Sequence, residues 1–394
     1  MLVIVAPGQG AQTPGFLTPW LELPGFADRM HWLSACAGLD LVDYGTNADA
    51  ETIRDTAVAQ PLLVGAGLVS LLALFPHPAD AFKVVGCGAG HSVGEVTAAA
   101  AAGIISAEQA MVFVRARGQA MAAASALEPT GMTAVLGGQA DAVLASIDAH
   151  GLFPANVNSE GQVVAAGSMA ALESFAADPP EGARLRPLSV AGAFHTPYMA
   201  PAVDVLAGYA RSITTHDART RLLSNADGSV VQSGREMLRR LVAQVSSPVR
   251  WDQCMSTMRD LGVTGLIEVP PAGTLAGLAK RALPDVEVVA LKTPADLEAA
   301  RSLVERHGTP SPLSQAPSWR MVVAPAKGRF QRSTASTGAS LAPGDRLGTV
   351  ITLRDEQPVA APHGGTVVEW LVEDGDPVAP GQPLVRLHPH GGGS

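Results

Sequence analysis

The sequence predicts an α/β fold followed by a small all-β domain at its C-terminal end. Short apolar runs such as LVIVA (2–6) and FKVVGCGAG (82–90) alternate with longer helical stretches such as SAEQAMVFVRARGQAMAAASAL (106–127), which is the α/β pattern. The chain has 394 residues, of which 47% are hydrophobic and 16% charged, so it can bury a large core in more than one domain. We expect helices to cover the strands on both sides.

The first domain is expected to end near residue 305. From Arg306 to Arg320 the sequence RHGTPSPLSQAPSWR has neither helical nor strand periodicity, because prolines and small polar residues interrupt both. We therefore predict one domain over 1–305 and an interdomain linker over 306–320.

An internal repeat follows the linker. APAKG at Ala324 recurs as APHGG at Ala361, and LAPGDRL at Leu341 recurs as VAPGQPL at Val378, both 37 residues later. Valines and leucines alternate with polar residues between Pro-Gly and Gly-Asp turns, which predicts a small β-sandwich over 321–390 with halves related by a pseudo-twofold axis. Residues 391–394 are expected to be a flexible tail.

Composition disfavours several classes of partner. The formal net charge of −9 offers no broad basic surface for nucleic acid or an anionic membrane. Cys36, Cys87 and Cys254 are scattered, odd in number and lack metal-ligand spacing, so free thiols in a cytoplasmic protein are expected. The N-terminal apolar run ends at Pro7, which is too short for a signal peptide or membrane span.

A serine between glycines is the first candidate for chemistry. Ser92 lies in GHSVG (90–94), where an apolar strand meets an alanine-rich segment. In a GxSxG turn, the glycines permit a crowded backbone that exposes the serine oxygen, and the N–H of Val93 at the helix start can stabilise an oxyanion. The alternative is a small residue in a glycine-rich turn.

A serine nucleophile needs a base, and His195 is the candidate. It lies in LSVAGAFHTPYM (188–199), just beyond a strand-like run, in a loop of small residues from which a side chain can reach a cleft. The alternative is a loop histidine whose hydrogen bonds go to the backbone. His91 is adjacent to Ser92 on a turn, so we assign it to packing or pocket lining.

A series of motifs resembles the malonyl-CoA:acyl carrier protein transacylases in order and spacing. The motifs are APGQGAQ at Ala6, QPLL at Gln60, GHSVGE at Gly90, RARGQAM at Arg115, GMTAVLGG at Gly131, ANVNSEGQVVAAG at Ala155, GAFHTPYM at Gly192, LLSNADG at Leu222 and QVSSPVRWDQCM at Gln244. The resemblance covers residues 1–305 and implies an α/β-hydrolase-like core with an inserted ferredoxin-like subdomain near 123–190. The active site would lie between the two.

The resemblance implies roles for individual residues. Ser92 would be the nucleophile and His195 the base, oriented by the backbone carbonyl of Gln244. The backbone N–H groups of Gln9 and Val93 would form the oxyanion hole.

Further residues would contact the substrate. The guanidinium of Arg117 can bind the malonyl carboxylate through two parallel hydrogen bonds, although arginines late in helices also pair with carbonyls or surface acids. Phe194, by its resemblance to the malonyl-type pattern of modular acyltransferases, would occupy the space of an α-methyl group. Gln60 and His91 would line the same site.

The mechanism implied is a two-step exchange without a cofactor or metal. Ser92 would take a malonyl group from malonyl-CoA, and the phosphopantetheine thiol of an acyl carrier protein would then accept it, for fatty-acid or polyketide synthesis. The sequence departs from the family at Val96, where relatives often have tyrosine, and at EVPPAG (268–273), where glycine-proline-glycine is usual. Asn156, Gln162 and Asn225 match the family and are interpreted as turn and cleft scaffolding.

Residues 321–390 resemble biotinyl and lipoyl carrier domains, through the repeat and APHGGTVVEWLVEDGDPVAPGQPLVRL (361–387). Those domains carry a lysine at a hairpin tip, and Arg354 stands at that position here. No lysine follows Lys327, so neither biotin nor lipoate is expected. The domain would be a docking or oligomerisation module, or else a tethered relic.

Three alternatives remain at this point. An esterase or thioesterase would use Ser92 and His195 with water as acceptor. A scaffold protein would present the C-terminal domain to a carboxylase or decarboxylase assembly. A malonate decarboxylase system would use the same malonyl loading in another pathway.

Overall fold

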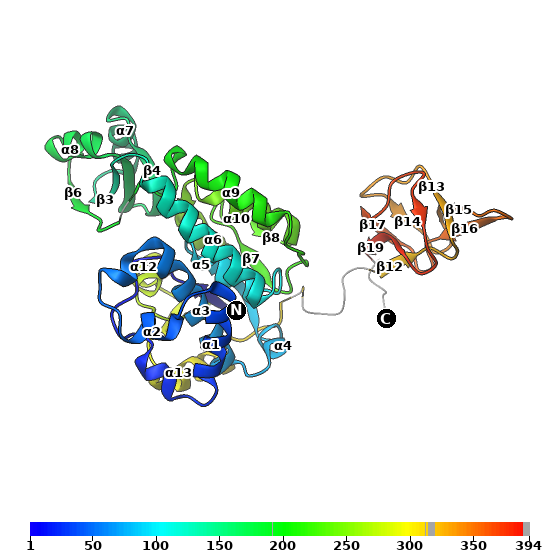
Figure 1. Cartoon of the computed structure of the whole chain (residues 1–394), viewed down its shortest axis with the longest axis horizontal. Coiled ribbons are helices and arrows are strands. Elements are labelled where there is room, and N and C mark those ends of the chain that lie inside the picture. Colours follow the sequence, from blue (N-terminus) through cyan, green and yellow to red (C-terminus); the bar gives the residue numbers. More distant parts are fainter. Residues whose placement is uncertain (191, 312, 314–319, 389–394) are drawn as a thin grey trace. The chain divides into compact units, whose positions relative to one another are not determined.

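A computed structural model describes residues 1–190, 192–311, 313 and 320–388. The chain divides into two compact units, Met1–Ser314 and Gln315–Ser394 (Figure 1). Residues 312 and 314–319 of the expected linker and the whole of the expected tail at 391–394 lie outside the described residues.

The first unit is built on a six-stranded sheet in the order β11-β10-β1-β2-β7-β8. The strands are β1 (Leu2–Ala6), β2 (Val85–Gly90), β7 (Arg221–Leu223), β8 (Val230–Val231), β10 (Gly265–Glu268) and β11 (Glu287–Ala290). Pairing is parallel from β11 to β7, and β8 closes the sheet in the antiparallel sense. The α/β class predicted from the alternating pattern is confirmed.

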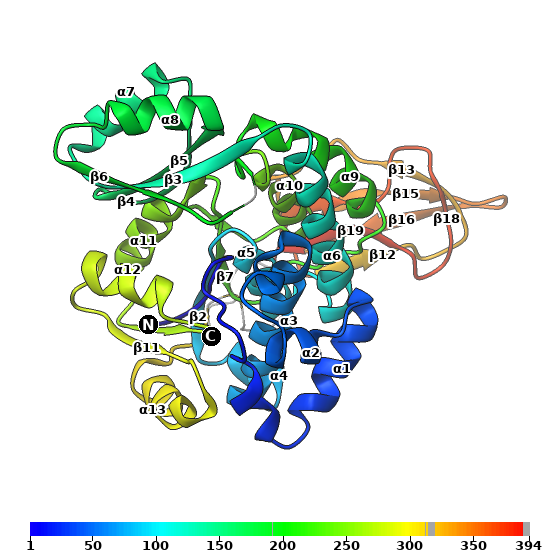
Figure 2. The ribbon, with the colours of Figure 1, turned by 60° about the vertical axis from the view of Figure 1, so that its left-hand side comes forward.

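Helices surround this sheet (Figures 1 and 2). The helices of the first unit are α1 (Phe26–Ala37), α2 (Leu41–Thr46), α3 (Thr56–Leu74), α4 (Pro78–Ala81), α5 (Gly94–Ala101), α6 (Ala107–Ser125), α7 (Ala140–Ala149), α8 (Met169–Ala177), α9 (Ala200–Ala210), α10 (Gly234–Gln244), α11 (Trp251–Asp260), α12 (Thr274–Ala282) and α13 (Leu297–His307).

Alternating side chains of the strands join two different cores. Val3 and Val5 of β1 pack in a cluster with residues of α11 and α12, whereas Leu2 of the same strand joins the larger cluster with α1, α3, α6 and α10. Leu222 and Leu223 divide in the same way. Because neighbouring side chains in a strand point to opposite faces, the sheet is buried on both sides.

A smaller, mostly antiparallel sheet follows α6 in the chain. Its strands are β3 (Thr130–Gly137), β4 (Phe153–Ser159), β5 (Gln162–Ser168) and β6 (Ala183–Pro187), and the sheet order is β6-β3-β5-β4-β9. Its β-α-β-β-α-β sequence of elements is that of ferredoxin-like folds. Helices α7 and α8 pack on it through a core that contains Val143, Ile147 and Phe175 (Figure 2). The edge strand β9 (Val249–Arg250) comes from much later in the chain and pairs parallel with β4.

The first unit extends slightly beyond the expected boundary at residue 305. Helix α13 ends at His307, and both Arg306 and His307 contact the carboxylate of Glu287 on β11. These contacts hold the last turn of the helix against the sheet.

Helix α3 is long and apolar enough, by length and composition alone, to cross a membrane. The helix is mostly buried inside the unit, where it packs along α6. Core helices of globular proteins have the same composition, so α3 is explained as a core element.

The second unit consists of two four-stranded sheets with the orders β12-β19-β17-β14 and β16-β15-β13-β18. The strands are β12 (Arg320–Val323), β13 (Gly328–Arg332), β14 (Ser340–Leu341), β15 (Arg346–Ile351), β16 (Glu356–Ala360), β17 (Gly365–Trp370), β18 (Pro377–Val378) and β19 (Pro383–His388). Strands β12, β13, β14 and β15 recur as β16, β17, β18 and β19 with the offset of the sequence repeat, and exchanging the members of each pair converts one sheet order into the other. The two halves therefore enclose one core around Phe330.

Candidate active site

Ser92 lies on a tight turn between β2 and α5. Its backbone φ is 53°, in the left-handed region that non-glycine residues rarely adopt. A Cβ atom at Gly90 would overlap the backbone of Gly94, and one at Gly94 would overlap the carbonyl of Ala6. The two glycines of GHSVG are therefore required by close backbone packing, and the turn exposes the serine oxygen.

Asn225 holds the backbone of this turn. Its Oδ1 atom accepts a 2.7 Å hydrogen bond from the N–H of Ser92, and its Nδ2 donates to the carbonyl of Gly90 at 2.7 Å. The side chain is fully buried. A strained φ persists only where its surroundings fix it, and Asn225 supplies that constraint on both sides of Ser92.

His195 contacts the hydroxyl of Ser92. The distance between Ser92 Oγ and His195 Nε2 is 2.7 Å, and His195 Nδ1 lies 2.9 Å from the carbonyl oxygen of Gln244. Because a carbonyl only accepts, Nδ1 carries the proton and Nε2 is free to accept one from Ser92. Burial, followed by the charge of Arg117, lowers the pKa of His195 to about 3. The imidazole is therefore neutral at neutral pH, as a general base must be.

Arg117 of α6 is buried beside the same serine. Its Nη2 lies 3.3 Å from Ser92 Oγ and donates to Gln244 Oε1 at 2.7 Å, while Nη1 donates to Gln60 Oε1 at 2.6 Å. Burial lowers its pKa to about 10, and Glu95 opposes this shift, so the guanidinium stays charged. Its Nε has no hydrogen-bond partner in the described part of the chain. Among the residues that the structure describes, two side-chain amides hold this arginine, and no backbone carbonyl or surface acid does.

The amides predicted for the oxyanion hole lie at the ends of two elements. Val93 immediately precedes α5, and Gln9 lies in the loop that follows β1. This loop starts beside the serine turn, because the N–H of His91 donates to the carbonyl of Ala6 at 2.9 Å. Neither the Val93 nor the Gln9 amide has an acceptor among the residues that the structure describes. Free N–H groups at a helix start can bind an anionic oxygen.

The remaining candidates surround this group. Phe194 is buried next to His195 in the main core. His91 Nε2 lies 2.9 Å from Asn158 Oδ1, and its ring packs edge-on against Trp251, so it links the serine turn to the smaller sheet. Gln60 contacts the site through Arg117. In the part of the chain described, no three His, Cys, Asp or Glu side chains gather as a metal site requires.

Comparisons with known proteins give this geometry a family. Residues 3–301 match the acyl transferase domain family. The malonyl CoA-acyl carrier protein transacylase of Mycobacterium tuberculosis H37Rv is 51% identical over 303 residues, which cover 77% of this chain and 100% of that protein. The chain belongs to the malonyl CoA-acyl carrier protein transacylase family.

Solved structures agree with this assignment of the transacylase. The crystal structure of MCAT from Mycobacterium tuberculosis superposes with a TM-score of 0.74 at 51% identity and covers 76% of this chain and 99% of its own. A malonyl-transacylase in complex with its type II PKS acyl-carrier protein gives a TM-score of 0.71 at 29% identity, with 76% and 99% covered.

Sequence reasoning missed a buried carboxylate beside this transacylase site. Glu95, on the first turn of α5, is 1% exposed. Its Oε1 accepts a 2.8 Å hydrogen bond from the N–H of Asn225, and its Oε2 accepts a short one from Gln244 Nε2. The available signal was a single acidic residue at the start of an alanine-rich apolar helix. An acidic side chain that is buried in such a helix needs hydrogen-bond partners, so its position indicates a buried polar contact.

The structure explains the surroundings of the two departures from the family pattern. Val96 is fully buried in the main core of the transacylase. Glu268, which begins EVPPAG, is also buried and accepts hydrogen bonds from the N–H groups of Gly273, Leu275 and Ala276 at the start of α12. This carboxylate therefore caps a helix in the first unit.

Proposed function

We propose that this transacylase moves a malonyl group from malonyl-CoA to the phosphopantetheine thiol of an acyl carrier protein, in fatty-acid synthesis. The observation that carries the proposal is the position of Ser92 Oγ, 2.7 Å from His195 Nε2 and 3.3 Å from Arg117 Nη2. A base and a permanent cation next to one hydroxyl suit an acyl donor that carries its own carboxylate.

The first half-reaction loads Ser92. Its Oγ forms a bond to the thioester carbonyl carbon while its proton passes to Nε2 of His195. The N–H groups of Gln9 and Val93 stabilise the oxygen that becomes negative. The carbon–sulfur bond then breaks, and the departing sulfur of coenzyme A takes the proton from His195.

The second half-reaction reverses these roles. The carrier thiol gives its proton to His195, its sulfur attacks the malonyl-serine carbonyl, and Ser92 Oγ leaves and recovers the proton. Arg117 holds the malonyl carboxylate in both steps, which orients the acyl group toward the incoming nucleophile. Because the carboxylate and the reacting carbonyl of a malonyl group are one methylene apart, the cation must lie next to the nucleophile, as Arg117 does.

The test is intact-protein mass after brief incubation with malonyl-CoA or acetyl-CoA, followed by addition of a phosphopantetheine-bearing carrier protein. We expect a malonyl adduct that Ser92→Ala abolishes, that acetyl-CoA forms poorly, and that moves to the carrier. An adduct discharged only by water would instead indicate a thioesterase.

A polyketide carrier is a second candidate acceptor. The structure of a malonyl-transacylase with its type II PKS acyl-carrier protein, at 29% identity, favours testing one. Transfer rates to fatty-acid and polyketide carriers, measured in competition, would rank the two acceptors.

For the second unit, we propose a biotinyl/lipoyl-like module that is not modified. Arg354 lies in the four-residue turn Thr352–Asp355 between β15 and β16, which Thr352 closes by hydrogen bonds to Asp355. This hairpin offers a guanidinium, which cannot form the amide that holds biotin or lipoate. Incubation with a biotin ligase, biotin and ATP should leave the intact mass unchanged, and a biotin adduct would contradict the proposal.

A further inference from the structure

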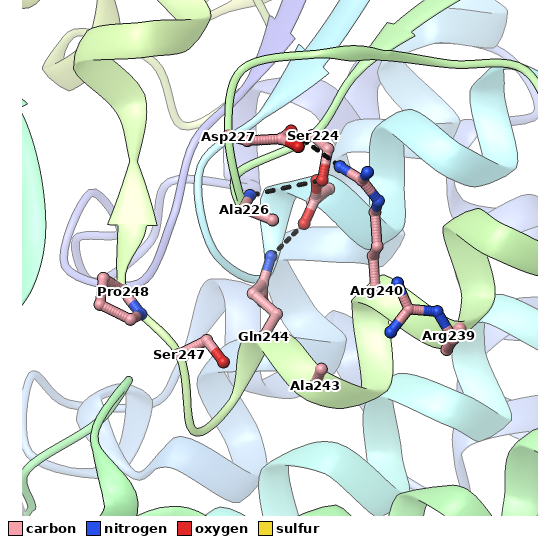
Figure 3. Close-up of a pocket in the computed structure, with 10 residues that line it drawn as sticks. Ser224, Ala226, Asp227, Arg239, Arg240, Ala243, Gln244, Ser247 and Pro248 are labelled. Carbon is pink, nitrogen blue, oxygen red and sulfur yellow. Dashed lines mark hydrogen bonds and ion pairs between the residues drawn. The ribbon is translucent and has the colours of Figure 1, made fainter.

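A pocket of about 260 Å³ opens behind the transacylase site (Figure 3). Neither Ser92, His195 nor Arg117 lines it. The lining side chains that matter here are Glu95, Ser224, Asp227, Arg239, Arg240 and Gln244.

The pocket connects the protein surface to Glu95. The side chains of Arg239 and Asp227 are 68% and 50% exposed, whereas Glu95 is 1% exposed. Figure 3 shows Asp227, Arg239, Arg240 and Gln244 among the side chains that line the pocket. Water-sized molecules can therefore approach the Glu95 carboxyl without passing Ser92.

One amide joins this carboxyl to the arginine of the site. Gln244 Nε2 donates to Glu95 Oε2, and Gln244 Oε1 accepts from Arg117 Nη2 at 2.7 Å. A carboxylate only accepts and a guanidinium only donates, so the two charges together fix which end of the Gln244 amide faces each of them. The backbone carbonyl of the same residue orients His195.

Among the charged and titratable groups that face one another here, Glu95 is the one whose pKa lies near neutral pH. Burial raises the pKa of Glu95 to about 7, although three hydrogen bonds and the charge of Arg117 lower it. Of the groups that face it, Arg117, Arg239 and Arg240 remain cations. Asp227 has a lowered pKa, and Cys254 of α11 has a raised one, so these two keep their charge state.

We propose that Glu95 is a positioning residue for malonyl recognition, which holds the Gln244 amide with its oxygen on Arg117 and exchanges its proton with solvent through the pocket. The inference rests on the proposed function, since it assumes that Arg117 binds the malonyl carboxylate. When Glu95 is ionised, Gln244 and Gln60 hold the two terminal nitrogens of the guanidinium in one plane. When Glu95 is neutral, Arg117 and the Ser92 carbonyl still set the direction of the Gln244 amide, but the charge-assisted hydrogen bond from Gln244 to Glu95 is lost and the hold on Arg117 weakens.

The experiment measures the first half-reaction by rapid quench and intact mass, at malonyl-CoA concentrations that define half-saturation and limiting rate. The variant is Glu95→Gln, whose neutral side chain removes the charge-assisted hydrogen bond that Gln244 Nε2 donates to Glu95. At about pH 8 we expect half-saturation for malonyl-CoA to rise about tenfold, while the limiting rate and loading from acetyl-CoA change less than about threefold.

The pH profile separates positioning from general structural damage. In the wild type, half-saturation should rise as the pH falls through about 7, because the pKa of Glu95 is raised to about 7 and its carboxylate is lost below it. Glu95→Gln should show no such rise. Asp227→Asn is the matched control, since Asp227 lines the same pocket at its exposed rim, and it should behave as the wild type.

Two outcomes would overturn the inference. One is a Glu95→Gln enzyme with wild-type half-saturation and pH profile, and the other is an equal loss with malonyl-CoA and acetyl-CoA. If thermal unfolding shows that Glu95→Gln does not fold, the variant Gln244→Met is used instead. This variant removes the side-chain amide but keeps the backbone carbonyl that contacts His195. Unchanged half-saturation for malonyl-CoA in Gln244→Met would overturn the inference. Failure of the proposed function is a separate result, in which the wild type forms no malonyl-serine at all.

Discussion

Arg117 Nη2 lies 3.3 Å from Ser92 Oγ, inside a buried site where each terminal nitrogen of the guanidinium already contacts a side-chain amide. A cation held in a fixed position therefore lies close enough to the nucleophile to bind the carboxylate of a short acyl group attached to Ser92. An unpaired buried charge is unfavourable, so an acyl donor that supplies a carboxylate gains binding energy that a neutral acyl group does not. Selectivity for the acyl group thus depends on how rigidly Arg117 is held.

Arg117→Lys should therefore weaken malonyl loading much more than acetyl loading. A lysine ammonium keeps the charge but cannot reach Gln60 and Gln244 in one plane and cannot bind a carboxylate through two parallel hydrogen bonds. We expect kcat/KM for malonyl-CoA to fall about 100-fold and that for acetyl-CoA to change less than about threefold. Loading from an equimolar mixture, read by intact mass, measures the ratio directly, and an unchanged ratio would contradict this role for Arg117.

Gly90→Ala should disrupt the serine turn itself. The new Cβ would overlap the backbone of Gly94, which cannot move without shifting Ser92 and the start of α5. We expect a loss of about 3 kcal/mol in the free energy of unfolding and little remaining Ser92 loading. Urea unfolding and intact mass measure the two effects.

Gly161→Ala is the matched control for that substitution. Gly161 has no positive φ, and a Cβ there meets nothing within 4 Å. Its free energy of unfolding should stay within about 0.5 kcal/mol of the wild type, with normal loading. A comparable loss in both variants would mean that crowding at Gly90 is not the cause.

The sequence was sufficient for features that depend on local patterns. Alternating apolar runs predicted the buried sheet, GHSVG predicted the turn at Ser92, and the repeat at Ala324 and Ala361 anticipated the two matching sheets of the second unit. Each of these depends on residues close together in the chain or on a regular spacing.

Features that depend on distant contacts could not be predicted in the same way. Glu95 is explained by Gln244, which lies 149 residues away, and a buried carboxyl has no periodic signal. The two-residue strand β9 could not be predicted from the sequence either, because it is too short to show a periodic pattern and is defined only by its pairing with β4. The resemblance to a family suggested the backbone carbonyl of Gln244 behind His195, but not the role of its side-chain amide.

His195 should make the stability of the first unit depend on pH. Its folded pKa is lowered to about 3, below the ordinary value of 6.5, so between these values the unfolded chain binds a proton that the folded chain does not. Stability from this group is therefore complete above about pH 6.5 and falls as the pH decreases. From about pH 7.5 to 5, the wild type should lose about 2 kcal/mol through this residue.

His195→Gln removes that dependence, and urea unfolding at the two pH values detects the difference. The raised pKa of Glu95 acts in the opposite direction, since the folded state gains a proton first as the pH falls through about 7. The comparison must therefore be between variants, with the exposed His216→Gln as control. Equal pH dependence in the wild type and His195→Gln would contradict a neutral buried imidazole.

Residues 1–313 alone should fold and load malonyl groups. The two units have separate hydrophobic cores, and none of the candidate site residues belongs to the second unit. The transacylase of Mycobacterium tuberculosis H37Rv is matched over its whole length by 77% of this chain, so a protein of that extent can be complete. We expect the shortened chain to keep its Ser92 loading rate within about twofold. Calorimetry should show two unfolding transitions for the full chain and one of these two for residues 1–313. If residues 1–313 do not fold, the second unit stabilises the first.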